Sequence, residues 1–446
     1  MKQLIILLSA AFAACTVQAK DYNIADFGAV SDTTRLSTQA IQQAIDACSQ
    51  AGGGRVVVPT GSYKTGTIVL KSNVDLHLEQ GATLYGSTNL KDYRPMKSSY
   101  MSLRTQTETV QLIYADGVSN VAISGTGTID GRGSAFPKLS WNDEGITRPH
   151  LIRFIQSHDI TISNVSLRNS GCWMQHYLAC DRLKIEDIKV TNRNNYNNDA
   201  LDLDGCHDVI VQGMLADSDD DGITLKSTSP RLSENIRISD CVVSSHCNAI
   251  KLGTETNGGF RNISISGIVV KPSYDQSSQF FGHPSKRGTS VISLEITDGG
   301  VMENVSVSDI VAEGTESPIF IWLGNRARGY QEGVPVTKIG SIRGITLSDI
   351  RVHDAGPTGC SILGLPGHPI ENVRLRNIVV EHRGGVGKTE IPADLKEKDY
   401  PEATMFGQLP AKGWFVRHAR NVCFDSVETI TQAPDERPEY VKIDVE

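Results

Sequence analysis

Apolar and polar residues alternate along this chain in short segments that recur many times. Residues 160–167 are one example: an alternating run, Ile-Thr-Ile-Ser, is followed by a break at Asn-Val and a second short run. Copies start about 23 to 28 residues apart, or about 40 to 49 residues apart where a loop has grown. The strong copies begin at Asp159, Arg182, Asp208, Asn235, Asn262, Asn304, Gly344 and Asn372, and the weaker ones near Asn120 and Asn421.

This repeat predicts strands rather than helices. Alternation with a period of two is the pattern of a strand with one buried face, and the break divides each copy into two short strands. No helix-length apolar pattern lies between copies, which argues against strand–helix–strand units. We therefore expect one all-β domain, a solenoid of parallel strands in which every coil buries an inward row of Ile, Val and Leu.

The start of the chain departs from the repeat. Ser37 and Thr38 can cap a helix that runs through Ile41 to Cys48, and the glycines at 52–54 would end it. We expect this helix to cover the end of the solenoid core. Five further segments break the alternation and are expected to be loops from one side, where a binding face would form: residues 88–112, 131–150, 273–289, 325–340 and 383–413.

Composition narrows the classes of function. The 446 residues carry a formal net charge of -8 without a long run of either sign, so nucleic acid is not an expected partner. An anionic ligand would have to be attracted by local Lys and Arg residues. The nine cysteines form no Cys-x-x-Cys pair, and we expect no zinc site. We interpret most of them, among them Cys48, Cys180, Cys206 and Cys241, as small buried apolar residues.

The N-terminus predicts export. Residues 1–19 have a basic start, an apolar stretch from 4 to 14 and a small-residue cleavage site, as in a signal peptide. Residues 20–446 would then form the mature domain, a monomer that is periplasmic or secreted. Phe12-Ala13-Ala14-Cys15 loosely resembles a lipobox, so anchoring through a lipid on Cys15 is the alternative. No other segment could span a membrane.

Two acidic clusters are separated by about one coil. Asp199 lies in the first cluster, Asp220 and Asp221 lie about 21 residues further on, and His246 follows after about 26 more. Positions one coil apart stack on the same face of a parallel solenoid, so we expect these four residues to converge. Crowded carboxylates repel one another, which raises at least one pKa and separates an acid from a base. Glycoside hydrolysis needs such a pair.

The acidic residues could also serve as calcium ligands or as structural residues. The order at 217–222 matches the opening of a calcium-binding loop, but Thr228 stands where a bidentate Glu is required. Asp and Asn are also common in turns and in the side-chain ladders of solenoids. We interpret Asp202 and Asp204, which alternate with leucines, as residues of a solvated face. We expect no metal and no cofactor.

At these residues the chain resembles glycoside hydrolase family 28, the polygalacturonases and rhamnogalacturonan hydrolases. The likeness extends over nearly the whole mature chain. The family's Asn-Thr-Asp motif matches residues 197–199, and its Gly-Asp-Asp motif matches residues 219–221. Of the family's Gly-His-Gly motif this chain keeps only the histidine, His246. Residues 22–29 and 127–131 also fit.

The resemblance implies a right-handed parallel β-helix and an inverting hydrolase of pectin. Asp220 would be the general acid, and Asp199 and Asp221 would hold and deprotonate the attacking water. His246 would tune the acid or hold substrate. Spacing alone does not establish inversion, which requires carboxyl groups roughly 6.5–9.5 Å apart.

One departure from the family bears on the substrate. The family's Arg-Ile-Lys motif, which grips a uronate carboxylate, should fall near Ile292, where residues 291–295 contain no cation. Losing that clamp weakens binding of a uronate, so we favour the rhamnogalacturonan backbone over homogalacturonan. The remaining candidate ligands for a carboxylate are Lys226, Lys251, Arg326 and Arg328. The alternatives are a polygalacturonase, a β-helix polysaccharide lyase, and a pectin-binding β-helix without catalysis.

Overall fold

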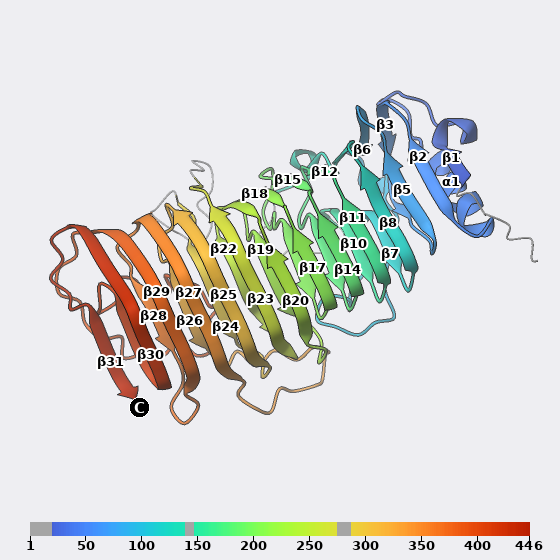
Figure 1. The fold of residues 1–446 in the computed structure, drawn as a ribbon. Coiled ribbons are helices and arrows are strands. Elements are labelled where there is room, and N and C mark those ends of the chain that lie inside the picture. Colours follow the sequence, from blue (N-terminus) through green and yellow to red (C-terminus); the bar gives the residue numbers. More distant parts are fainter. Residues whose placement is uncertain (1–19, 139–146, 274–286) are drawn as a thin grey trace, which may run out of the picture.

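The chain winds into a parallel β-helix. The structure is a computed structural model that describes residues 20–138, 147–273 and 287–446. Strands of successive coils pair in parallel register, as β11 and β14 do through Ile160 and Leu183. Figure 1 shows the coils stacked from the helix α1 at one end to β31 at the other. The expected signal peptide and the Cys15 alternative lie outside the described residues.

The strands form three rows along the axis of the coil. Row A consists of β4 (Ile68–Val69), β7 (Gln111–Asp116), β10 (His150–Ile155), β13 (Gln175–Leu178), β16 (Leu201–Asp204), β19 (Ile223–Ser227), β22 (Asn248–Thr256), β24 (Ser290–Ile296), β26 (Ile319–Leu323), β28 (Cys360–Leu363), the start of β30 (Trp414–Ala433) and β31 (Tyr440–Val445).

Row B consists of β1 (Lys20–Asn23), β2 (Gly54–Val58), β5 (Val74–Leu78), β8 (Ser119–Gly125), β11 (His158–Ser163), β14 (Asp181–Glu186), β17 (His207–Gln212) and β20 (Ser233–Ser239). Row C consists of β3 (Gly61–Thr65), β6 (Ala82–Gly86), β9 (Thr128–Asp130), β12 (Ser166–Arg168), β15 (Lys189–Asn192), β18 (Leu215–Ser218) and β21 (Val242–Ser245). Rows B and C then merge in the long strands β23 (Gly259–Val270), β25 (Val301–Glu313), β27 (Ser341–Ala355), β29 (Ile370–Gly384) and β30.

The repeat predicted from the sequence forms these strands. Alternate residues such as Ile236 and Ile238 point inward and are fully or almost fully buried, so each coil adds apolar side chains to one continuous core. Polar side chains on the outside stack as well. Asn262 has a left-handed backbone conformation (φ 55°), which Asn tolerates. Its amide donates to Asn235 over 3.1 Å and accepts from Asn304 over 3.3 Å.

The predicted N-terminal helix is confirmed as α1 (Thr38–Gln50), with Ile41, Ile45 and Cys48 buried against the first coils. Its capping differs from the expectation, because the Ser37 side chain makes no cap bond. The Thr38 hydroxyl instead accepts a bond from the Gly66 backbone over 2.7 Å, which ties the helix to the turn between β3 and β4. Three short 3₁₀ helices lie in connecting regions: η1 (Ile24–Phe27), η2 (Leu90–Asp92) and η3 (Gly133–Ala135).

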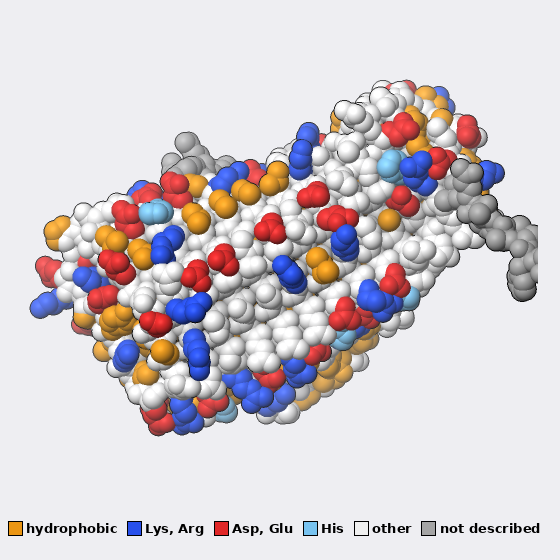
Figure 2. All heavy atoms as spheres, in the orientation of Figure 1, with side chains coloured by type: hydrophobic (Ala, Val, Ile, Leu, Met, Phe, Trp, Pro, Cys, Tyr) orange, Lys and Arg blue, Asp and Glu red, His pale blue; other side chains and the backbone are white. Residues whose placement is uncertain are grey.

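The expected loops at 88–112, 325–340 and 383–413 are confirmed, whereas residues 139–146 and 274–286 of the other two expected loops lie outside the described residues. For example, β29 ends at Gly384 and β30 begins at Trp414. Cys48, Cys180, Cys206 and Cys241 are buried free thiols, as predicted. None of the helices in the described ranges has the length and hydropathy that a membrane crossing requires. On the face shown in Figure 2, acidic and basic side chains are interspersed.

Candidate active site

The predicted acidic residues converge at the turns that precede row A. Asp199 precedes β16, and Asp220 and Asp221 precede β19. The Ala200 backbone donates to the Asp221 carbonyl over 2.9 Å, which fixes Asp199 beside Asp221 on adjacent coils. All three carboxylates are buried, with 3 %, 8 % and 2 % of Asp199, Asp220 and Asp221 exposed. The convergence predicted from coil length is therefore confirmed for these three.

Asp220 combines burial with a neighbouring negative charge. Burial, followed by the charge of Asp221, raises the pKa of Asp220 to about 6. The Asp221 backbone donates to Asp220 Oδ1 over 2.9 Å, while Lys251 and Lys226 oppose the rise. A carboxyl group with such a pKa carries a proton in mildly acidic solution and can give it up, as a general acid must.

Asp221 is surrounded by donors. The Asn248 backbone and side chain donate to Asp221 Oδ1 over 3.1 Å and 2.8 Å. Lys251 Nζ lies 3.0 Å from Asp221 Oδ2. These contacts stabilise a negative charge on Asp221, so two adjacent aspartates have different surroundings.

Asp199 lies on the other side of the pair. Burial, followed by the charges of Asp202 and Asp220, raises its pKa well above the usual range. Its Oδ2 lies 4.0 Å from Lys226 Nζ, and its Oδ1 is buried without a hydrogen-bond partner among the described residues. Such an unpaired oxygen is costly to bury and is suited to bind a water molecule or a sugar hydroxyl.

The interpretation of Asp202 and Asp204 as solvated residues is wrong. Both are fully buried, because other segments cover the outer face of row A at this point. Asp204 accepts from the Thr228 backbone over 2.8 Å and lies 3.1 Å from His176 Nε2. Burial raises the pKa of Asp202 to about 8, although Lys226 lies 3.5 Å away.

His246 is brought to the same turns, but not directly beside Asp220. The pairing of Ser218 with Ser245 aligns His246 with Asp219 and leaves Cys247 beside Asp220. His246 is buried, and its backbone donates to the Ser218 carbonyl over 3.1 Å.

The four predicted cations differ in their surroundings. Lys226 is buried between acidic groups and lies 3.5 Å from Glu255, and Lys251 is buried against Asp221. Arg328 lies 3.0 Å from Asp298. Arg326 stacks on the ring of Tyr400 at 5.0 Å.

Arg326 keeps a donor available. Its Nη1 is buried without a hydrogen-bond partner in the part of the chain that the structure describes. Burial, together with the charge of Arg328, lowers the pKa of Arg326, but a guanidinium stays charged. It is therefore the predicted cation best placed to bind a carboxylate from outside the chain.

Sequence reasoning missed several residues of the site. Trp173 lies under two cations, Lys226 Nζ at 4.8 Å and the Arg104 guanidinium at 4.9 Å. The Tyr400 hydroxyl lies 3.4 Å from Lys251 Nζ. Arg104 and Tyr400 come from the loops at 88–112 and 383–413, where the only signal was the interruption of the repeat.

Two buried glutamates also belong to this neighbourhood. Burial raises the pKa of Glu295 to about 7 and that of Glu402 to about 8, against the charge of Lys251 in both cases. The Ser293 hydroxyl donates to Glu295 over 2.6 Å. Both groups can be protonated near neutral pH, which limits the negative charge around Asp221.

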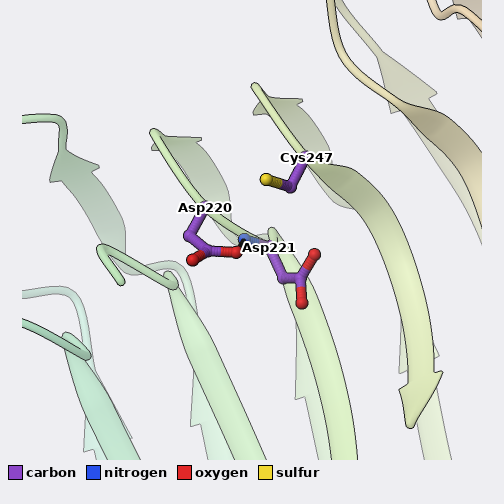
Figure 3. A group of neighbouring side chains, drawn as sticks. All are labelled: Asp220, Asp221 and Cys247. Atoms are coloured by element: carbon purple, nitrogen blue, oxygen red, sulfur yellow. Dashed lines mark hydrogen bonds between the residues drawn. The ribbon is translucent and has the colours of Figure 1, made fainter. Parts of the chain in front are cut away.

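One group in the site has the composition of a metal site. Oxygens of Asp220 and Asp221 and the Cys247 sulfur lie within 4.8 Å of one another, and Figure 3 shows Cys247 on the coil next to the two aspartates. Burial raises the pKa of the Cys247 thiol well above its usual value, and a protonated thiol is a poor ligand. Lys251 also occupies Asp221 Oδ2. The expectation of no metal stays a prediction.

Comparison with known proteins gives the family. Residues 48–397 match the model of glycosyl hydrolases family 28. The chain belongs to family 28. A probable polygalacturonase from Vitis vinifera is 26% identical over 394 residues, covering 84% of this chain and 77% of that protein. Rhamnogalacturonase A of Emericella nidulans is 25% identical over 357 residues, covering 76% and 63%.

Membership of family 28 agrees with the fold. An exopolygalacturonase structure from Thermotoga maritima superposes with a TM-score of 0.69 at 22% identity, covering 82% of this chain and 88% of that one. At this identity the likeness shows the fold, a right-handed parallel β-helix, as the resemblance implied. The protein is therefore a pectin-degrading glycoside hydrolase.

Proposed function

We propose that the protein hydrolyses a galacturonosyl linkage in pectin with inversion at the anomeric carbon. The observation that carries this proposal is the pair Asp220 and Asp221: neighbours in the chain, one with a pKa of about 6 and the other bound to Lys251. Such divergent surroundings separate acid and base roles between identical groups.

The reaction needs two proton transfers. Asp220, protonated, donates to the leaving glycosidic oxygen as the bond to the anomeric carbon breaks. Asp221 accepts a proton from the attacking water, and Asp199 holds that water through its unpaired Oδ1. His246, which the register aligns with Asp219 on the next coil, tunes the protonation of the acid or holds substrate in this proposal.

Rhamnogalacturonan is the first candidate substrate. The site offers Arg326 to bind one substrate carboxylate. At the two positions where the family's Arg-Ile-Lys motif has cations, this chain has Val291, which lies in the core, and Ser293. One cation suits a galacturonate on one side of the bond and a neutral rhamnose on the other. Lys226, Lys251 and Arg328 are already paired with carboxylates and would contribute less.

Homogalacturonan is the second candidate. The Vitis vinifera relative carries the name polygalacturonase, and Arg326 would serve a uronate equally well. Digestion of rhamnogalacturonan and polygalacturonate side by side decides between them, with products analysed by mass. Faster release from polygalacturonate would contradict the preference inferred from Val291 and Ser293.

The mechanism has its own test. Asp220→Asn should lower kcat by about 10²–10⁴-fold, since it removes one acid–base group, while the unfolding temperature stays close to that of the unaltered protein. The product of the unaltered enzyme should have the opposite anomeric configuration to the cleaved linkage. Near-normal turnover in Asp220→Asn would remove Asp220 from the acid role, and an ultraviolet-absorbing product would indicate a lyase.

The proposed function also bears on where in or outside the cell the enzyme acts. A pectic polymer is a substrate outside the cytoplasm, which agrees with the signal-like residues 1–19. We propose that the enzyme is exported to the periplasm or beyond and acts there as a monomer, without a metal or cofactor.

A further inference from the structure

The outer face of row A is polar over only a few coils. Six polar side chains are register neighbours on successive strands of row A: Arg153, His176, Asp202, Thr224, Lys251 and Ser293, on β10, β13, β16, β19, β22 and β24. These six strands span about 24 Å, at about 4.8 Å for each of five steps. A polysaccharide lying along the axis of the coil would have to continue past both edges of this polar stretch.

The N-terminal edge is covered. Tyr114, Ile155 and Leu178 of row A form an apolar cluster, and Met96 and Tyr100 from the preceding loop pack against it. The same loop is hydrogen-bonded further along. The Leu103 backbone donates to the Thr228 carbonyl over 2.8 Å, and the Tyr100 hydroxyl lies 2.8 Å from that of Ser229. The loop therefore begins over the apolar cluster and runs along the C-terminal ends of the row A strands as far as β19.

The C-terminal edge is covered by a different segment. Phe320, Trp322, Leu363 and Phe415 on β26, β28 and β30 pack with a second loop, through the residues Ala403, Leu409 and Ala411. Phe320 occupies the position that Lys251 and Ser293 hold on the preceding strands. At its near edge the loop reaches back over the polar stretch, where Tyr400 lies against Lys251 and Arg326.

A third loop, which follows β26, connects the two covering segments. Its Glu332 backbone donates to the Gln106 side chain over 3.0 Å, and its Asn325 backbone donates to the Glu397 carbonyl over 2.6 Å.

Glu255 binds the loop before β7 and the loop after β26, at 2.6 Å from Arg104 and 3.8 Å from Arg328. The polar stretch is thus bounded on three sides by described residues.

We propose that the enzyme binds the end of a pectic chain, or a short oligosaccharide, and that Tyr400 stops the chain beyond the cleaved bond. This proposal rests on the proposed hydrolase function. A site for internal cleavage needs a groove that is continuous along the axis of the coil, whereas here apolar clusters cover row A on both sides of the aspartates. Lys251 and Arg326 lie over the Tyr400 ring at 5.5 Å and 5.0 Å, so this boundary offers a terminal uronic sugar positive charge held in place by an aromatic side chain.

The time course of digestion tests this proposal. Polygalacturonate and rhamnogalacturonan are digested separately while new reducing ends and viscosity are followed. Action on chain ends should raise the number of reducing ends while viscosity falls slowly, with only the shortest products at early times. A rapid loss of viscosity with a ladder of longer products would contradict chain-end binding but leave the hydrolase function intact. Absence of new reducing ends from both polymers would contradict the hydrolase function itself.

A variant tests the part played by Tyr400. Tyr400→Ala should raise KM by about tenfold or more and lengthen the released products, because it opens the C-terminal boundary. Tyr400→Phe keeps the ring and should keep the products short. Tyr85→Ala is the matched control: Tyr85 lies in row C, where its ring contacts Arg132, and should leave products unchanged. Unaltered KM and products in a folded Tyr400→Ala enzyme would contradict the role of Tyr400.

Discussion

At the scale of single residues, the function depends on one lysine as much as on the aspartates. Lys251 is buried, lies 3.0 Å from Asp221 Oδ2 and lowers the pKa values of Asp220, Glu295 and Glu402 below what burial alone would give. Its charge favours the ionised form of each neighbour. Lys251 therefore sets the pH range in which an acid and a base coexist.

Replacing this lysine should displace the pH profile. In the unaltered enzyme kcat should fall as the pH rises through about 6, because Asp220 loses its proton. Lys251→Met removes a cation, so the pKa of Asp220 rises and this limb of the profile should move to higher pH while the maximum kcat drops. Lys251→Arg keeps the charge and should leave the limb near its original position. An unmoved limb in Lys251→Met would show that another group controls it.

At the scale of elements, the outer ladders hold coil to coil. Asn262 combines a left-handed backbone conformation with two side-chain bonds to neighbouring coils. Asn262→Ala should lower the free energy of unfolding by about 1–3 kcal/mol, since alanine is strained in this conformation and the bonds are lost. The exposed Ser264 in the same strand provides the control: Ser264→Ala should change stability by less than about 0.5 kcal/mol. Both are measured by urea unfolding.

Glu255 connects elements that are far apart in the chain. It lies 3.5 Å from Lys226 and also binds Arg104 and Arg328. Burial alone would raise the pKa of Glu255, but the three cations lower it well below the usual range. Glu255→Gln leaves these cations uncompensated and should lower the free energy of unfolding by about 3–5 kcal/mol.

The pH dependence of that loss gives a second readout. Because the folded pKa of Glu255 is depressed, its contribution is complete above the unfolded value of about 4.3 and is lost as the pH falls below it. The difference between Glu255→Gln and the unaltered protein should therefore shrink in acid. Asp159→Asn, which breaks an exposed pair with Arg182, should change stability little, because solvent screens such a pair. A comparable loss in both variants would contradict a special role for Glu255.

At the scale of the whole molecule, the sequence predicted the strands of the coil better than the loops that cover their outer face. Inward positions such as Ile236 and Ile238 follow from period-two alternation, and the aspartates follow from coil length. The burial of Asp202 and Asp204 could not be predicted in this way, because alternation is the same whether the outer face meets water or another segment. The contact between Tyr400 and Lys251 joins residues 149 apart in the chain. It depends on how a loop without periodicity packs.

The two ends of the coil differ in the element that covers them. The helix α1 closes the first coil with Ile41 and Ile45, whereas β31 is the last strand and carries the exposed charges Lys442 and Asp444. A stack of parallel strands is in principle a template on which further copies could polymerise into fibres. The helix over the first coil and the charges along β31 both oppose such growth.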